Sequence, residues 1–249
     1  TRQMKAIILA AGYATRLYPL TLDKPKPLLE VNKKIMLDYI IEKIPKEVQP
    51  IYVVTNNKFY VIFNNWKKTQ ARNLEIINDQ TTSNDDRLGA MGDIHFAINK
   101  ENLAKDDLLI IGGDNLFEFE LNRFLEFFKR KNASCIGLID IKDKNLIAKK
   151  LGCVLLDEQQ KIIDFEEKPE FPKSTYSSTL IYALTVDDIA DLDNCLKQHK
   201  TFDNAGEFIK YLSQKKAVYG YIFHEQWFDI GSLDQLKAAE SYMKAKEKK

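Results

Sequence analysis

The chain has 249 residues, of which 45% are hydrophobic, and this length suffices for one large α/β domain. Its 37 basic and 36 acidic residues nearly cancel, which argues against a nucleic-acid polymer as a partner. The longest apolar run near the start, residues 6–11, is too short for a membrane span or a typical signal peptide. We therefore expect a single cytoplasmic domain over residues 1–249 that binds neither nucleic acid nor membrane.

Short aliphatic runs alternate with helical patterns in the first half of the chain. Strands are predicted at residues 5–9, 51–55, 74–77 and 108–111. Apolar residues at helical spacing lie between them, as in residues 37–44. This alternation predicts an α/β fold, in which a Rossmann-like, mixed and mostly parallel sheet is flanked by helices.

The second half of the chain continues the pattern. It predicts a helix at residues 121–128, strands at 134–139, 153–156, 161–165, 179–184 and 217–223, and a closing helix from residue 233. The runs at 153–156 and 161–165 are separated by four polar residues, so they predict a hairpin. No repeat or low-complexity linker divides the chain.

The cysteines and histidines are scattered and follow no metal-ligand spacing. They are Cys135, Cys153 and Cys195, and His95, His199 and His224. Neither a disulfide framework nor a zinc site is indicated, so we expect structural roles for all six. Tyr13, Trp66 and the aromatic stripe at 124–128 are likewise expected to pack in the core or at its rim.

The strand that ends at Leu9 leads directly into a turn of small residues. Ala10, Ala11 and Gly12 leave the backbone N–H groups of this turn open to a ligand, and a helix is expected to begin just after them. N–H groups at such a turn and at a helix N-terminus bind phosphate well.

Positive charge follows this turn at short range. Arg16 comes just after it, and Lys26 lies between two prolines that restrict the backbone around it. An ordinary strand-to-helix turn would also contain a glycine, but it would not need Thr15, Arg16 and Lys26 at these spacings. The segment therefore predicts a binding site for a nucleoside triphosphate.

Charged residues follow other predicted strands at the point where each strand ends. Asp114 follows the strand at 108–111 after two glycines, which we expect to let a ligand or metal come close. Glu167 and Lys168 follow the strand at 161–165, and Asp229 follows an aromatic pair. Ligands of open α/β sheets bind outside the carboxyl ends of the strands, so we expect these groups to share one site, with Mg²⁺ as its cofactor.

Together these motifs resemble the sugar-1-phosphate nucleotidylyltransferases, especially the short thymidylyl- and uridylyltransferases without a hexapeptide-repeat domain. Residues 9–27 match the signature L-A-A-G-x-G-T-R-L-x-P-L-T followed by K-P-K-P. Residues 88–92 are similar to L-G-T-A-G, 113–115 to G-D-N, 167–169 to E-K-P and 227–231 to W-x-D-x-G. The resemblance covers nearly the whole chain and implies the nucleotide-diphospho-sugar transferase fold.

The resemblance also implies roles for individual residues. Backbone beside Gly89 would touch the base, and Asp114 and Asp229 would bind the metal. Glu167 would hold an acceptor hydroxyl and Lys168 the acceptor phosphate. Asn115, Gly152 and Leu180 would line the acceptor site. Members of such families often form dimers or tetramers, so a homo-oligomer is one expectation.

Four positions near the motifs differ from the family pattern or bear on the choice of base. Ala14 replaces the second glycine of the first motif, and Leu180 replaces a glycine of the family's N-x-G-I-Y segment, which would narrow the acceptor wall. Asp79 and Gln80 both lie where a base-reading residue is expected. The Gln80 amide would pair with the O4 and N3–H edge of uracil or thymine, which favours dTTP or UTP.

The expected reaction is attack by an acceptor phosphate on the α-phosphorus of the triphosphate, with release of pyrophosphate. Arg16 and the turn would hold the β- and γ-phosphates, Lys26 the α-phosphate and Lys168 the attacking phosphate. Residues 4–115 would form mainly the nucleotide half, 116–232 the acceptor half and 233–249 a C-terminal helix. The alternatives are a CTP-dependent enzyme that acts on phosphocholine, and a non-catalytic nucleotide-sugar-binding regulatory subunit.

Overall fold

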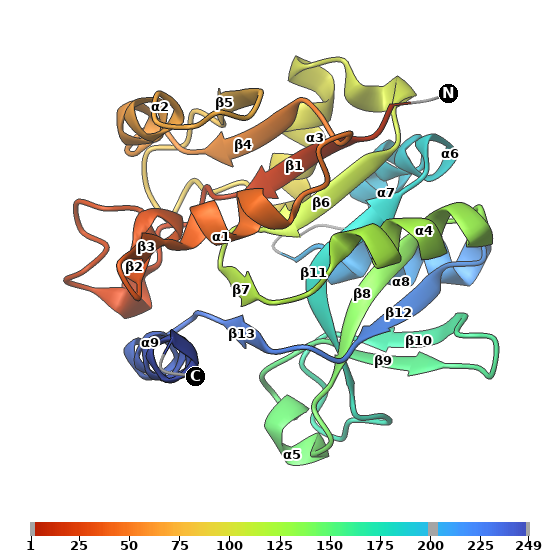
Figure 1. Ribbon diagram of the computed structural model, residues 1–249. Coiled ribbons are helices and arrows are strands. Elements are labelled where there is room, and N and C mark those ends of the chain that lie inside the picture. Colours follow the sequence, from red (N-terminus) through yellow and green to blue (C-terminus); the bar gives the residue numbers. More distant parts are fainter. Residues whose placement is uncertain (1–2, 199–203, 248–249) are drawn as a thin grey trace.

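The structure is a computed structural model that describes residues 3–198 and 204–247. His199 lies outside these residues. A mixed sheet crosses the centre of the molecule with helices on both faces (Figure 1). This arrangement confirms the predicted fold class.

The first half of the chain forms the parallel part of the sheet. Its strands are β1 (Lys5–Leu9), β4 (Ile51–Thr55), β5 (Leu74–Asn78) and β6 (Leu108–Gly112). β1 lies between β4 and β6, and β5 pairs with β4, all in parallel. The side chains of β4 and β6 are buried throughout, as expected where helices cover both faces of a parallel sheet.

The second half of the chain extends this sheet through β11 (Tyr176–Leu184), which runs antiparallel to β6. The remaining strands are β8 (Cys135–Asp140), β9 (Cys153–Leu156), β10 (Ile162–Glu166) and β12 (Tyr219–Phe223). β9 and β10 form the predicted hairpin. β8 pairs with both β11 and β12. Strands from both halves of the chain therefore share one sheet.

Apolar residues of the sheet and helices form a core on each face. One face packs against α1 (Met36–Lys43), α2 (Tyr60–Lys67) and α4 (Leu121–Lys131). The other packs against α3 (Gly89–Lys100), α6 (Val186–Ile189), α7 (Leu192–Gln198) and α8 (Gly206–Lys215). Tyr13, Trp66 and Phe124 are buried, as expected, and so are the three cysteine thiols.

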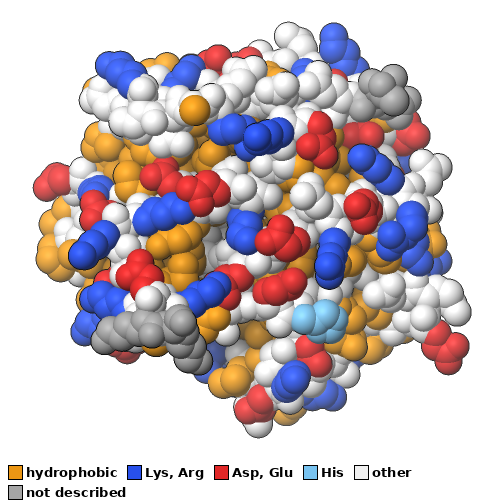
Figure 2. Space-filling model, viewed as in Figure 1, with side chains coloured by type: hydrophobic (Ala, Val, Ile, Leu, Met, Phe, Trp, Pro, Cys, Tyr) orange, Lys and Arg blue, Asp and Glu red, His pale blue; other side chains and the backbone are white. Residues whose placement is uncertain are grey.

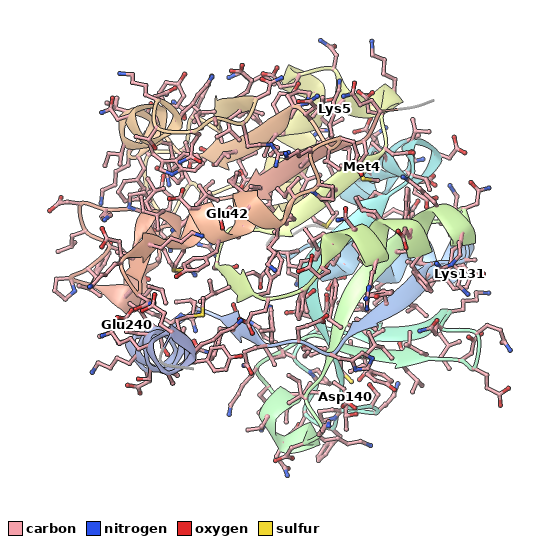
Figure 3. The ribbon with its side chains drawn as sticks, viewed as in Figure 1. Met4, Lys5, Glu42, Lys131, Asp140 and Glu240 are labelled. Atoms are coloured by element: carbon pink, nitrogen blue, oxygen red, sulfur yellow. The ribbon has the colours of Figure 1, made fainter. Side chains whose placement is uncertain are left out.

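Smaller elements close one end of the sheet. β7 (Asn115–Phe117) pairs with β13 (Trp227–Asp229), and β2 (Glu30–Val31) pairs with β3 (Lys34–Ile35). α9 (Leu233–Glu247) lies beside this region, and Glu240 accepts a hydrogen bond from the backbone N–H of Asn32 (Figure 3). α5 (Lys144–Ile147) stands at the far end, below β9.

Lys, Arg, Asp and Glu side chains are interspersed over the face shown in Figure 2, with no large area of a single sign. Across residues 3–198 and 204–247, no helix combines the length and the apolar character needed to cross a membrane.

Candidate functional site

The turn after β1 lines a small cavity of about 280 Å³ at the carboxyl edge of the sheet. Leu9, Ala10, Ala11 and Gly12 all line it. The turn is held from the next strand, because Ala10 N–H donates to Val54 O over 2.8 Å and the Asn56 amide donates to Ala11 O over 2.8 Å. A Cβ added to Gly12 would meet nothing within 4 Å, so this backbone stays open to a ligand.

The α-helix expected directly after this turn does not form. Only a single 3-10 turn, Thr15–Leu17, follows it, preceded by Ala14 at a left-handed φ of 47°. Pro19 cannot donate a backbone hydrogen bond, so it does not support an extended helix here. The N–H groups that face a ligand therefore belong to the turn itself and not to a long helix end. Thr15 lines neither of the cavities described in this section.

Lys26 connects this turn to two distant parts of the chain. Its Nζ lies 3.1 Å from Asp114 Oδ2 and donates to Ile230 O over 2.8 Å. The side chain is only 16% exposed, and the flanking prolines fix the backbone that carries it. The ammonium group is thus held in place at the mouth of the small cavity, which Lys26 also lines.

Asp114 and Asp229 lie side by side. β7 and β13 pair so that Asn115 is opposite Asp229, and Ile230 N–H donates to Asp114 O over 3.0 Å. Burial and the charge of Asp114 raise the pKa of Asp229 to about 6, while Lys26, Arg16 and Lys168 act in the opposite direction. Five of the predicted site residues therefore interact electrostatically around one point.

The two glycines before Asp114 allow close approach within the fold, and Gly112 also lines the small cavity. A Cβ on Gly113 would lie 2.6 Å from Leu9 O, to which the Gly113 N–H donates over 2.8 Å. A Cβ on Gly112 would lie 2.8 Å from a methyl group of Leu180. Glycine is needed here because β1 and β11 approach this segment closely.

A larger cavity of about 640 Å³ adjoins the small one. Among the predicted residues it is lined by Arg16, Asp114, Asn115, Gly152, Glu167, Lys168, Leu180 and Asp229. Asp114 and Leu180 line both cavities, so ligands in the two would meet at Asp114. Gly89 lines the small cavity, at the start of α3.

Glu167 occupies the far part of the larger cavity. Burial raises its pKa, and the adjacent Lys168 opposes this effect. A Cβ on Gly152 or on Gly206 would lie 3.1 Å from Glu167 Oε2, so both glycines leave room around the carboxylate. Gly206 was not singled out in the sequence, because its position at the start of α8 gives no local motif.

Other lining residues were also missed. They are Lys149, Lys150, Phe165, Ser178, Tyr182, Asn204 and Trp227. Ser178, Tyr182 and Trp227 lie in the segments compared above with N-x-G-I-Y and W-x-D-x-G, whereas the other four belong to no motif. All seven come together only when the segments around α5, β10, β11, β13 and the start of α8 are assembled. The position of Lys149 and Lys150 just after α5 adds positive charge to the rim.

Four residues with a strained backbone border the cavities. Ala14, Lys149, Lys168 and Leu180 have φ between 46° and 60°, and each lines one of the two cavities. This left-handed region costs a residue other than glycine about 1–2 kcal/mol. Ala14 and Leu180 stand where the resemblance expects glycine. The backbone at both positions is nevertheless left-handed, a conformation that glycine adopts more easily than alanine or leucine.

Asn115 and Gln80 differ in their relation to the cavities, because Asn115 lines the larger one and Gln80 lines neither. Asn115 is buried, and its side chain is committed to the fold, donating to Thr179 O over 2.7 Å and accepting from Trp227 Nε1 over 2.8 Å. Gln80 is exposed, its φ is 70°, and it is not among the residues that line either cavity. The neighbouring Asp79 is buried and accepts two hydrogen bonds from Thr81.

A carboxyl group that the sequence reasoning did not find lines the small cavity. Asp93 lies on α3 and is only 6% exposed. Burial, with a further contribution from Asp79, raises its pKa to about 9. A buried, perturbed carboxyl in a cleft marks a functional position more often than a surface charge does.

The site can bind two anionic ligands next to each other, with cations on both sides and two carboxylates where the ligands meet. This geometry is typical of proteins that bring phosphate groups together. The chain belongs to the nucleotidyl transferase family, whose model matches residues 5–246. The predicted family resemblance is thereby confirmed.

Sequence relatives vary in length and in name. The chain is 29% identical over 245 residues to the bifunctional protein GlmU of Methanococcus vannielii, covering 96% of this chain and 55% of that protein. It is 29% identical over 229 residues to the D-glycero-alpha-D-manno-heptose 1-phosphate guanylyltransferase of Campylobacter jejuni, covering 92% and 95%. The chain thus spans about half the length of the GlmU relatives it matches.

Solved structures share the fold at lower sequence identity. A putative glucose-1-phosphate thymidylyltransferase from Bacillus anthracis, in complex with a sucrose, superposes with a TM-score of 0.82 at 22% identity. That match covers 96% of this chain and 94% of the other. A UDP-glucose pyrophosphorylase complexed with UDP-glucose gives 0.83 at 17% identity, over 98% and 99%.

The Asp93→Asn variant should gain stability relative to the parent protein as the pH rises. Above about pH 4 the unfolded chain releases the Asp93 proton, whereas the folded protein holds it up to about pH 9. The parent protein therefore loses stability across this window, and asparagine does not titrate. In thermal melts, the Tm of Asp93→Asn minus the Tm of the parent protein should be more positive at pH 8 than at pH 5. An equal difference at both pH values would contradict the assignment.

Proposed function

We propose that the chain transfers a nucleotidyl group from a nucleoside triphosphate to the phosphate of a sugar 1-phosphate, forming a nucleotide sugar and pyrophosphate. The main support is the meeting of the two cavities at Asp114, with Lys26 on one side and Asp229 on the other. In this proposal the small cavity binds the nucleotide and the larger cavity the acceptor. The names of the relatives agree with this reaction class.

The residues divide naturally between the two substrates. Lys26 and the open turn at Gly12 would hold the triphosphate in the small cavity. Arg16 lines the larger cavity, so it would reach the triphosphate only where the two cavities meet. Lys168 would hold the acceptor phosphate and aim its oxygen at the α-phosphorus. Because the protein must bring two polyanions together, neutralising charge and fixing the line of attack provide most of the catalysis.

The acceptor end of the larger cavity suits a hydroxylated ring. Glu167 can accept hydrogen bonds from hydroxyl groups, and Ser178 and Asn204 offer further polar partners. Gly152 and Gly206 leave space for the ring, since larger residues would crowd the Glu167 carboxylate. This polar lining favours a sugar 1-phosphate over phosphocholine.

The carboxylates also fit a divalent cation. In the described part of the chain, no group of three or more His, Cys, Asp or Glu side chains is placed to hold a metal. Mg²⁺ at nucleotide sites often uses one or two carboxylates and fills its other positions with phosphate and water, which the pair Asp114 and Asp229 matches. When bound there, Mg²⁺ would offset the repulsion between the phosphates.

We further propose UTP or dTTP as the nucleotide. The support is the small cavity, where backbone N–H groups at the start of α3 lie near a carboxyl that can accept. A pyrophosphate-release assay tests the whole proposal, with dTTP, UTP, GTP, CTP and ATP crossed against several sugar 1-phosphates and phosphocholine in the presence of Mg²⁺. Release with CTP and phosphocholine alone would establish the alternative enzyme. Nucleotide-sugar binding without release would establish a non-catalytic role.

Lys26→Ala should lower turnover by about 10²- to 10³-fold while the protein stays folded, because the variant loses a fixed charge beside the reacting phosphates. Steady-state pyrophosphate release measures the effect, and circular dichroism checks the fold. Lys24→Ala is the matched control, since Lys24 carries the same charge but lines neither cavity as described. Normal turnover by folded Lys26→Ala would remove Lys26 from the mechanism.

Asp114→Asn and Asp229→Asn should each raise the Mg²⁺ concentration needed for half-maximal activity. An amide oxygen is a weaker ligand for a hard cation than a carboxylate oxygen. Mg²⁺ titrations of initial rate provide the measurement, with Asp234→Asn on α9 as control. If both site variants respond to Mg²⁺ like the parent protein, the metal assignment is wrong.

Lys168→Ala should raise the acceptor KM and lower kcat, while the affinity for nucleotide changes little. Lys168 lines the larger cavity and not the small one, so it meets the nucleotide only at the reacting phosphate. Calorimetry with each substrate separates the two effects. Loss of nucleotide binding with intact acceptor binding would refute the proposed division of the site. Glu167→Gln should instead change which acceptor is preferred.

Leu180→Gly should shift acceptor use toward larger sugars, because the leucine side chain stands between the cavities. The change in stability should be small, since glycine relieves the left-handed φ of 55° while the half-buried side chain is lost. Competition assays between sugar 1-phosphates of different size would show the shift. An unchanged preference would mean that Leu180 does not border the acceptor.

A further inference from the structure

The small cavity is lined by a buried carboxyl group, that of Asp93. It lies one helical turn after Gly89, in the first part of α3, and it lines the cavity together with the turn at residues 9–12. Burying a carboxyl group is costly unless it is hydrogen-bonded, and the transfer step proposed above does not involve this group. Its presence therefore needs an explanation.

One oxygen of this carboxyl has no partner. Oδ1 of Asp93 is buried and makes no hydrogen bond to any residue that the structure describes. The carboxyl does interact through a side-chain hydrogen bond with Asp79. Asp79 is itself held in position, because its Oδ1 accepts from Thr81 N–H and Oγ1, each over 2.8 Å, and Thr81 Oγ1 pairs with Tyr13.

The pairing with Asp79 determines the chemistry of the free oxygen. A hydrogen bond between two carboxyl groups needs a proton, and the raised pKa of Asp93, about 9, keeps one there at neutral pH. If that proton faces Asp79, Asp93 Oδ1 is a carbonyl-type acceptor.

We propose that Asp93 is a specificity-determining residue that accepts a hydrogen bond from the ring N3–H of a uracil or thymine base in the small cavity. This inference rests on the proposed nucleotide-binding function. The pair with Asp79 holds the acceptor at a fixed place, so a base that carries a ring N–H there is favoured over one that carries a lone pair.

The start of α3 supplies the complementary donors. The first N–H groups of an α-helix have no acceptor within the helix, and Gly89 and Ala90 line the same cavity as Asp93. Donors beside a single acceptor match the O4, N3–H, O2 edge of uracil and thymine. The guanine edge offers two adjacent donors, and the cytosine ring nitrogen is itself an acceptor, so both match less well.

The test compares UTP with 3-methyluridine 5′-triphosphate, which lacks the N3 proton. Calorimetry should show that the parent protein binds UTP at least about 10-fold more tightly than the methylated analogue, because a buried acceptor left unpaired costs about 1–3 kcal/mol. In Asp93→Ala the two affinities should come within about 2-fold of each other. Asp93→Asn should keep the preference, since its amide retains a carbonyl acceptor and an N–H toward Asp79.

Asn99→Ala, on the exposed end of α3, is the control and should bind both nucleotides like the parent protein. A parent protein that does not distinguish the two nucleotides, or that binds GTP or CTP in place of UTP, overturns the proposal. So does a folded Asp93→Ala that keeps the parent ratio, or an Asp93→Asn that loses it. If Asp93→Ala fails to fold, the parent protein and Asp93→Asn still decide the matter.

Binding does not require turnover, so the outcomes are separable. Selective UTP binding without pyrophosphate release would refute the proposed reaction and leave the role of Asp93 intact. Pyrophosphate release with UTP, together with equal affinity for the methylated analogue, would refute only the role of Asp93.

Discussion

The site depends on a like-charge contact that the fold enforces. Pairing of β7 with β13 brings Asp229 next to Asp114, although 115 positions separate them in the chain. Neighbouring carboxylates repel each other, and the raised pKa of Asp229 reflects its burial together with that repulsion. Lys26 compensates in part by contacting both Asp114 and the backbone at Ile230. A cation bound near the two carboxylates would reduce this repulsion further.

Several residues that line the site have a strained backbone. Residues with a left-handed φ border both cavities, and at Ala14 and Leu180 the strain falls on side chains that do not adopt this conformation easily. The surrounding sheet is densely packed on both faces and can hold such residues in place. At Leu180, which has this conformation, the side chain lies beside Gly112 where the two cavities meet. The rigid core thus supports an edge that is shaped for ligands.

Prediction from sequence succeeded where a short segment contains the whole pattern. The alternation of apolar runs predicted the sheet and the hairpin β9–β10. The charged motifs singled out Lys26, Asp114, Lys168 and Asp229, which the fold brings close together. It was wrong where backbone geometry decides, as in the 3-10 turn that stands in place of the expected helix after residue 14. It missed Asp93 because a single acid within a helix pattern resembles a solvent-facing residue, and only the packing of α3 against the turn after β5 shows that it is buried.

The sequence by itself determined the class of fold and the chemical character of the site. Strand and helix periods are local properties, and the motif around residues 9–27 carries its turn, its glycine and its cations within one short stretch. Only the tertiary structure decided which charges face one another, which glycines are needed by the backbone and which residues of β11 and of the segment that leads into α8 complete the larger cavity. These outcomes depend on contacts between distant segments, such as β7 with β13 and β11 with β6. Their geometry is set by register and packing across the whole sheet, and no local pattern encodes it.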